Sequence, residues 1–302
     1  MKSGVLLLAH GAPERVEDVP EYLSYVRGGQ PVSPRVLEEV ASRYREIGGS
    51  SPLTRWTRVQ AEALEKLLGL PVFFGMRNWR PLIRETMEQV RAAGIGRLAC
   101  VCLAPQFAEL SVGLYMKRTM EAAGGIELTW AKSYHEEPLL IEAFAERLAG
   151  ARGRVIFTAH SLPAPNDGYE RECRETAAAV ARRAGLAEYG FAFQSQGMSG
   201  GEWLGPTVES LLDTEGAAGE DGGSDEGLGL GRSQEARDSF PAKEVVIAPI
   251  GFVCDHVEIL YDVDVQFKKY AAQRGIALSR IESLNGSETF TRALAEVAKR
   301  CL

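Results

Sequence analysis

Two of the four histidines in this chain stand at the end of short apolar runs. His10 ends the run that begins at residue 5, and His160 ends the run at residues 154–159. Ligands of parallel α/β sheets bind beyond the carboxyl ends of the strands. An imidazole in that place can bind a metal ion or exchange a proton near neutral pH, although it can also simply bond a loop carbonyl. The two histidines therefore mark candidate sites.

A second group of candidate residues lies in the acidic segment 251–264, directly after another apolar run. Glu258 and Asp262 are four residues apart and share one face of a helix, which Asp255 is expected to cap. Stacked carboxylates repel unless a cation or a proton is handled there, and the alternative is a solvated helix face. Because imidazole and carboxylate together suit a borderline ion such as iron(II), the residues predict a metal or proton site.

The runs that carry these residues alternate with helical patterns. Strands are predicted at residues 4–9, 72–75, 98–104, 154–159 and 244–250, and helices at 55–68, 81–93, 138–148 and 206–212. This alternation predicts an α/β fold with parallel sheets that are covered by helices on both faces.

Short strings in the first half of the chain have similar counterparts in the second half. The string LLAHG at residues 7–11 resembles FTAHS at 157–161, and LAP at 103–105 resembles IAP at 247–249. The similar spacing predicts two like-built domains, residues 1–150 and 151–302, although short strings also match by chance. Residues 213–240 are acidic, rich in glycine and poor in large apolar side chains, so we expect a flexible insertion in the second domain.

Composition excludes several classes of function. The chain has 302 residues, 45% of them hydrophobic, which is enough for two full cores. Its formal net charge of -7 leaves no broad basic surface, so nucleic acid is not an expected partner. Neither a P-loop nor a strand-linked GxGxxG occurs, which argues against NTPases and dehydrogenases.

The cysteines and the apolar runs indicate a cytoplasmic protein. The five cysteines are odd in number and scattered, as is typical of free thiols in a reducing compartment. Cys100 and Cys102 lie in an apolar run and are predicted to pack in the core, so no iron–sulfur cluster is expected. The first apolar run is too short for a signal peptide, and no run is long enough for a transmembrane helix.

Six segments resemble the signature blocks of ferrochelatases, in the order of that family. The segments are RYREIGGSSPL at 43–53, GMRNWRP at 75–81, LAPQFAELSVGLYMKR at 103–118, FTAHSLP at 157–163, QSQGMSGGEWLGP at 194–206 and FVCDHVEILYDVD at 252–264. The resemblance covers most of the chain and is greatest to bacterial coproporphyrin ferrochelatase. It implies the chelatase fold, two Rossmann-like domains with a porphyrin cleft between them.

The resemblance also implies the chemistry. His160 and Glu258 match the catalytic pair, which would bind Fe(II) and accept the pyrrole protons that the metal displaces. The enzyme would be a lyase of haem biosynthesis that releases two protons, with coproporphyrin III as the expected porphyrin. Asp262 would continue a proton or metal path, which relatives often extend with a further carboxylate. Gln266 stands at that position here, so water or Asp264 would have to complete the path.

Contacts to the porphyrin are carried over in the same way. The matching residues are His10, Arg27, Arg43, Tyr44, Ser51 and Tyr115. Arginine suits the propionates because it pairs with a carboxylate through two hydrogen bonds, although Arg43 and Tyr44 could instead face solvent on a helix. His10 stands where some relatives have a tyrosine that approaches the iron from the face opposite the catalytic histidine. An imidazole there could ligate the iron of the product.

Two other functions remain open from the sequence. The first is a cobalt or nickel chelatase that acts on another tetrapyrrole, and the second is a noncatalytic carrier of porphyrin or haem. In each case the expected partners are a tetrapyrrole and a metal ion. Iron enters as a substrate, no resident prosthetic group is expected, and the chain is expected to act as a monomer.

Overall fold

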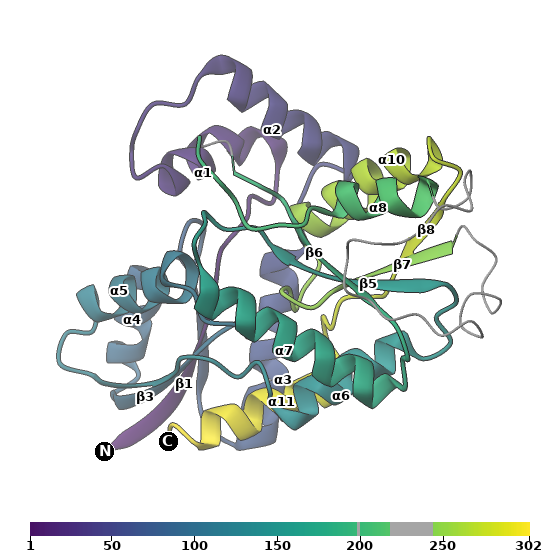
Figure 1. The fold of residues 1–302 in the computed structure, drawn as a ribbon. Coiled ribbons are helices and arrows are strands. Elements are labelled where there is room, and N and C mark those ends of the chain that lie inside the picture. The colour runs from purple at the N-terminus through teal and green to yellow at the C-terminus, as the bar shows by residue number, and fades with distance from the viewer. Residues whose placement is uncertain (198–199, 218–243) are drawn as a thin grey trace.

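A computed structural model of the chain describes residues 1–197, 200–217 and 244–302, and its strands form two sheets (Figure 1). The first sheet has the order β2-β1-β3-β4 and contains β1 (Lys2–Ala9), β2 (Val72–Met76), β3 (Ile95–Cys102) and β4 (Glu127–Ala131). The second has the order β6-β5-β7-β8 and contains β5 (Arg154–His160), β6 (Gly190–Gln194), β7 (Glu244–Pro249) and β8 (Ala277–Arg280). All paired strands are parallel.

The two sheets have the same strand order, in agreement with the similar strings in the two halves of the sequence. Strands β1 and β5 hold corresponding places, and so do β3 and β7. These inner strands are apolar because helices cover both faces of each sheet. His10 directly follows β1 and His160 ends β5, so the duplication puts the two histidines at equivalent sheet edges. The predicted α/β fold is confirmed.

The helices account for most of the remaining described chain. They are η1 (Val16–Asp18), α1 (Val19–Val26), α2 (Pro34–Glu46), α3 (Leu53–Leu68), α4 (Ile83–Ala92), η2 (Glu109–Gly113), α5 (Leu114–Glu121), α6 (Pro138–Leu148), α7 (Asp167–Ala184), α8 (Val208–Ala217), η3 (Glu258–Phe267), α10 (Lys268–Ala272) and α11 (Glu288–Lys299). Elements η2 and η3 are π-helical, and η1 is a 3₁₀ turn. Helices α1 and α2 form a hairpin (Figure 1), and their buried residues share a small core with Trp79, which follows β2.

Local sequence signals explain several helix ends. Ser33 accepts a hydrogen bond from the amide of Val36 and precedes Pro34, so α2 begins there. Gly69 ends α3 in the left-handed conformation, and Gly185 ends α7 in the same way.

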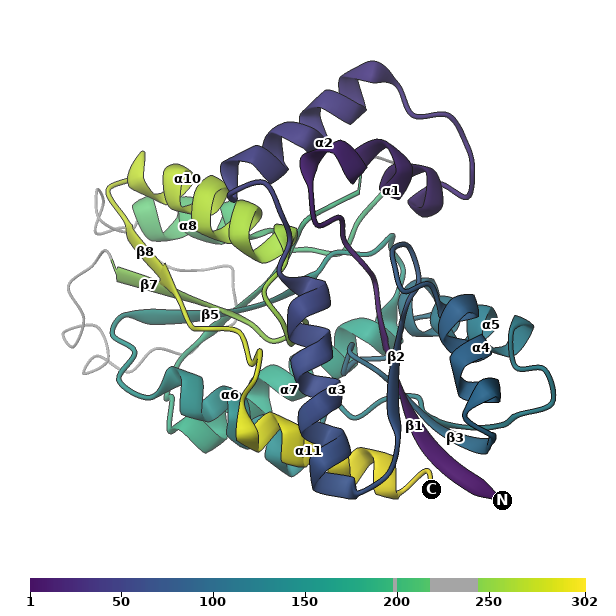
Figure 2. The same cartoon turned by 180° about the vertical axis from the view of Figure 1, so that it is seen from behind.

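The last helix returns to the first half of the molecule. Helix α11 follows β8 in the chain but packs against α3 and α6 (Figure 2). Its buried residues, Phe290 and Leu294 among them, belong to a core that also contains residues of β1 and β5. Close to the carboxyl end, Thr129 of β4 donates a hydrogen bond to the carbonyl of Cys301. The two sheets therefore share a core, and the division at residue 150 stays a prediction.

The predicted strands and helices form, with small shifts at their ends. Strands β4, β6 and β8 were not predicted from the sequence. The predicted start of the acidic insertion was wrong, because residues 213–217 continue α8. Asp213 pairs with Arg274 and accepts a hydrogen bond from Tyr270, which holds this acidic turn in the helix. Residues 218–240 of the predicted insertion lie outside the described residues.

Gly11, directly after His10, provides a test of how the fold positions the site. Its φ is +86°, and a Cβ there would lie 2.7 Å from the backbone nitrogen of Trp79. We expect Gly11→Ala to lower the free energy of unfolding by about 3 kcal/mol or more, since strain and a backbone clash add. The control Gly69→Ala has φ of +64° and open space around its Cβ, so its expected cost is about 1 kcal/mol. Urea denaturation would contradict this account if both losses were equal.

Candidate functional site

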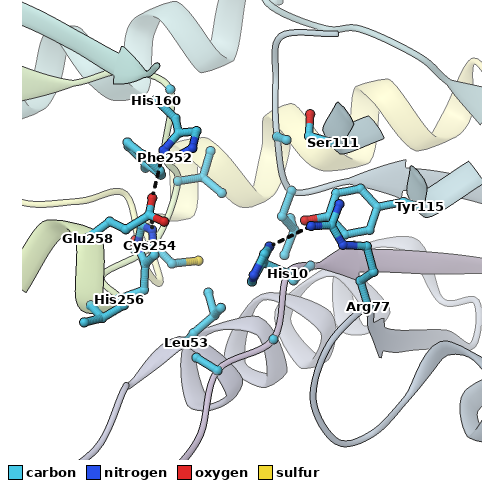
Figure 3. Close-up of a pocket in the computed structure, with 18 of the residues that line it drawn as sticks. His10, Leu53, Arg77, Ser111, Tyr115, His160, Phe252, Cys254, His256 and Glu258 are labelled. Carbon is cyan, nitrogen blue, oxygen red and sulfur yellow. Dashed lines mark hydrogen bonds and ion pairs between the residues drawn. The ribbon is translucent and has the colours of Figure 1, made fainter. Parts of the chain in front are cut away.

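A cavity of about 210 Å³ is lined by residues that follow β1, β3, β5 and β7. His10 and Tyr115 line it from the first half of the chain, and His160 and Glu258 line it from the second. Figure 3 shows these two groups on opposite sides of the cavity. Most other lining side chains are apolar, Leu53 among them. The carboxyl ends of both sheets therefore open on one shared site, as expected for α/β folds.

The imidazole of His160 and the carboxylate of Glu258 form the central contact of the site. His160 Nδ1 lies 3.3 Å from Glu258 Oε2, and each side chain is about one third exposed. Burial lowers the pKa of His160, but the Glu258 carboxylate outweighs burial, so this pKa lies above its ordinary value. Burial raises the pKa of Glu258, but His160 and then His256 outweigh it, so this pKa lies well below its ordinary value. The contact therefore favours the charged form of both partners.

The imidazole of His256 also faces Glu258. No role was predicted for His256 from the sequence. Its Nδ1 lies 3.0 Å from the carbonyl oxygen of Cys254, which can only accept a hydrogen bond. His256 Nδ1 therefore carries a proton, and Nε2 faces Glu258 Oε2 at 3.6 Å. The carboxylate lies between two imidazoles, an arrangement that can hold or pass a proton.

Asp262 lies four residues beyond Glu258 in the π-helical element η3 and is buried. Burial, followed by the Glu258 charge, raises its pKa from 3.8 to about 6. The Ser195 hydroxyl donates a hydrogen bond to Asp262, and the backbone of Ser195 has φ of +60°. A non-glycine residue in this conformation is strained and is often found at functional sites. The predicted acidic line therefore includes a carboxyl group that binds protons more readily than usual.

The prediction that Asp255 caps this helix was wrong, and Asp264, one of two alternatives for completing the acidic line, has other partners. Asp255 does not cap η3, because its carboxylate accepts hydrogen bonds from Ser283 and Asn285 and pairs with Arg280. Arg280 also lies 2.9 Å from Asp264, so this second carboxylate is neutralised away from the cavity lining. Asp264 therefore does not extend the acidic line beyond Asp262.

His10 lies across the cavity from this pair, in a different electrostatic environment. Burial and then the nearby Arg77 lower its pKa to about 3, so the ring is neutral at ordinary pH. Tyr22 Oη and Asn78 Nδ2 each lie 3.1 Å from its Nε2. The tyrosine and asparagine, like Arg77, had no predicted role. A signal was present for two of them, since Arg77 and Asn78 lie in the GMRNWRP block.

Of the other predicted porphyrin contacts, only Tyr115 lies on the cavity lining. Arg27 is exposed at the end of α1, and Arg43 pairs with Glu39 at 2.8 Å. Tyr44 is buried in the core of the α1–α2 hairpin, and Ser51 is buried. Contacts of these four residues with a porphyrin stay predictions.

Other expectations concern metals, thiols and membranes. No group of three or more His, Cys, Asp or Glu side chains in the described chain has the arrangement of a resident metal site. Cys100 and Cys102 are buried in the core beside β1, as predicted. None of the helices that the structure describes is long and apolar enough to cross a bilayer.

Comparisons with known proteins agree with this arrangement. The model of the family described as Ferrochelatase matches residues 2–221 and 234–302. A ferrochelatase from Acidobacterium capsulatum is 41% identical over 99% of this chain and 94% of its own length. The coproporphyrin III ferrochelatase from Bacillus subtilis is 31% identical over 100% of this chain and 98% of its own length. The sirohydrochlorin chelatase SirB from Bacillus subtilis subspecies spizizenii matches at a TM-score of 0.57 over 100% of this chain and 95% of its own, and its 10% identity indicates a shared fold alone.

The raised pKa of Asp262 predicts a pH-dependent loss of stability. The folded state prefers the protonated carboxyl, so stability is lost as the pH rises from about 4 through about 6. Asp262→Asn removes this ionisation and keeps an oxygen for Ser195. We expect the variant to be roughly 1–3 kcal/mol more stable than wild type at pH 8, with little difference at pH 4.

Urea denaturation at both pH values measures this difference. Asp264→Asn is the control, since it removes contacts with Arg280 and Lys268 and is therefore expected to lower stability. A gap between Asp262→Asn and wild type that does not grow with pH would contradict the assignment.

Proposed function

The chain belongs to the ferrochelatase family, and from this premise we propose that it inserts Fe(II) into coproporphyrin III and releases two protons. Ferrochelatases are lyases of haem biosynthesis that insert iron into a porphyrin. The observation that carries the proposed chemistry is the contact of His160 with Glu258 at the cavity. It joins an imidazole, which can bind a metal ion or accept a proton, to a carboxylate that raises the pKa of this imidazole.

The pair explains how one site could handle a metal ion and a proton. The Glu258 carboxylate raises the pKa of His160, so this imidazole is a stronger base than usual. In its neutral form, His160 donates its Nδ1 proton to Glu258 and the other ring nitrogen has a lone pair. That nitrogen can bind Fe(II) or take a proton from a pyrrole. Insertion must remove two pyrrole protons, and the neighbouring His256 and Asp262 give them further acceptors. We propose that protons leave along this acidic line.

The proposed preference for coproporphyrin III rests on charge and on relatives. Coproporphyrin carries four propionates, whereas protoporphyrin carries two. Arg27 and Arg43 lie on the α1–α2 hairpin, whose residue Tyr22 lines the cavity. Several relatives at 30–32% identity are called coproporphyrin III ferrochelatases, while others are called ferrochelatases. The cavity is smaller than most ligand pockets, so the macrocycle would bind in a widened cleft.

The remaining expectations are part of the same proposal. We propose that the enzyme acts as a cytoplasmic monomer and that iron is its substrate, with no resident prosthetic group or iron–sulfur cluster. The burial of Cys100 and Cys102 in the core supports the last point. A metal competition assay with cobalt and nickel would separate this function from another chelatase activity.

Replacing His160 tests the catalytic role. We expect His160→Ala to lower kcat for iron insertion by about 10²–10⁴-fold, because the metal ligand and proton acceptor is lost. Porphyrin binding should survive, as measured by fluorescence quenching. A noncatalytic carrier would show no insertion in the wild-type protein either.

His135→Ala is the matched control for this experiment. His135 also contacts a carboxylate, with Nε2 3.0 Å from Glu175 Oε2, but it does not line the cavity. Its insertion rate should stay close to that of the wild type. If His160→Ala also inserted iron near the wild-type rate, the mechanism would be wrong.

Turnover of porphyrins with four and two propionates tests the substrate. We expect kcat/KM for coproporphyrin III to exceed that for protoporphyrin IX by about tenfold, because one charge-assisted hydrogen bond contributes about 1.5–3 kcal/mol. Arg27→Met should reduce this ratio, whereas Arg35→Met, at another exposed arginine of the hairpin, should preserve it. Equal turnover of both porphyrins by the wild type would rule out the proposed preference.

A further inference from the structure

On the cavity wall opposite His160 and Glu258, both ring nitrogens of His10 have polar side chains within hydrogen-bond distance. Arg77 Nη2 lies 3.3 Å from Nδ1, and Tyr22 Oη lies 3.1 Å from Nε2 (Figure 3 shows the arginine contact). Backbone hydrogen bonds from the amides of Arg77 and Asn78 to the carbonyls of Ala9 and His10 fix the two segments side by side. The ring therefore has little freedom to turn.

The chemistry of arginine decides which ring nitrogen carries the proton. A guanidinium can donate hydrogen bonds but cannot accept one, and it stays charged in proteins. His10 Nδ1 must therefore accept from Arg77, which leaves the proton of the neutral ring on Nε2. The hydroxyl oxygen of Tyr22 is placed to accept this proton. With the proton on Nε2, the Asn78 amide must present its oxygen to this nitrogen, which reverses the placement of the amide nitrogen 3.1 Å from Nε2.

Arg77 is itself fixed in place on the cavity lining. Its Nη1 donates to the carbonyl of Leu110 at 3.3 Å, and its guanidinium lies 5.2 Å from the centre of the Tyr115 ring. No carboxylate among the described residues forms an ion pair with it. Burial and then the charge of Arg77 lower the pKa of His10 by more than the Glu258 charge raises it, so the uncharged ring is favoured.

This arrangement is the reverse of the one that suits a metal ligand. A histidine that binds iron usually presents a lone pair on one nitrogen while the other nitrogen donates its proton to an acceptor. In His10 the lone pair is used by Arg77, and the other nitrogen carries the proton. We propose that Arg77 is a positioning residue that prevents His10 from ligating the iron of the porphyrin, so that the protein binds the metal only from the side of His160 and Glu258.

The inference rests on the proposed function and deepens it, because it describes how the same site treats its product. An imidazole on each face of the ring would give the iron two strong axial ligands and slow the release of the metalloporphyrin. With His10 held by Arg77, one face of the product carries no protein ligand. The product can then leave once the contact on the His160 side is broken.

Binding of preformed iron(III) coproporphyrin III tests this inference without requiring insertion. Absorption and electron paramagnetic resonance spectra report whether an imidazole ligates the iron. We expect His10→Phe to leave the spectra of the wild-type complex unchanged. Arg77→Met should free Nδ1 and produce a new low-spin signal, together with porphyrin dissociation slowed about tenfold or more. The signal should disappear in the double variant Arg77→Met/His10→Phe.

Arg77→Lys is the conservative control, since lysine keeps the charge and a donor and should preserve the wild-type spectra. A purely structural role for Arg77 would change binding or stability without creating a signal that depends on His10. The inference is overturned if His10→Phe removes a low-spin signal from the wild-type complex, a result that does not depend on whether the Arg77 variants fold. Wild-type protein that bound no iron porphyrin would contradict this inference and the proposed function together, whereas a His10-dependent low-spin signal in the wild-type complex would overturn this inference alone.

Discussion

The contact between the His160 imidazole and the Glu258 carboxylate is the interaction on which the site depends. Burial disfavours the charge of each group, and its partner is the main influence that opposes burial, with His256 adding to the effect at Glu258. Loss of Glu258 would remove the contact that raises the pKa of His160, and loss of His160 would leave Glu258 with His256 alone. The two side chains come from separate elements, β5 and η3, so the contact forms only if the fold holds these elements at a fixed spacing.

Several contacts hold those two elements at the required spacing. Gln194, the last residue of β6, accepts a hydrogen bond from Thr158 of β5 at 2.6 Å and donates one to the carbonyl of Glu258 at 3.2 Å. Gly251 has the same effect at the end of β7, since a Cβ there would lie 2.9 Å from the Cα of Ala159. The strand that leads to Glu258 can approach the strand that bears His160 only because this residue has no side chain.

The sequence predicted β2 and the apolar inner strands β1, β3, β5 and β7 but missed β4, β6 and β8, although β6 is buried along its whole length. Strands β4 and β8 lie at sheet edges and are only partly buried, so their residues show little hydrophobic contrast with a loop. Asp255 was misread as a helix cap because its real partner, Arg280, is distant in the chain. His256 and Arg77 stood in recognisable blocks, but their roles depend on hydrogen-bond directions that spacing does not contain. The family resemblance supplied the proposed catalytic pair, His160 and Glu258, and the structure supplied the neighbours that shift the pKa values of the two residues.

The two halves of the molecule show how one duplicated frame supports two different histidines. His10 and His160 occupy equivalent positions beyond β1 and β5, yet their neighbours carry opposite charge. Burial and then Arg77 lower the pKa of His10, while Glu258 raises the pKa of His160 against the effect of burial. Environments that separate the pKa values of like groups assign them separate roles. We propose that a metal ion between the two sheets meets a basic imidazole beside a carboxylate on one side and an already bonded imidazole on the other, so the neighbours of each histidine would set the side on which the metal binds.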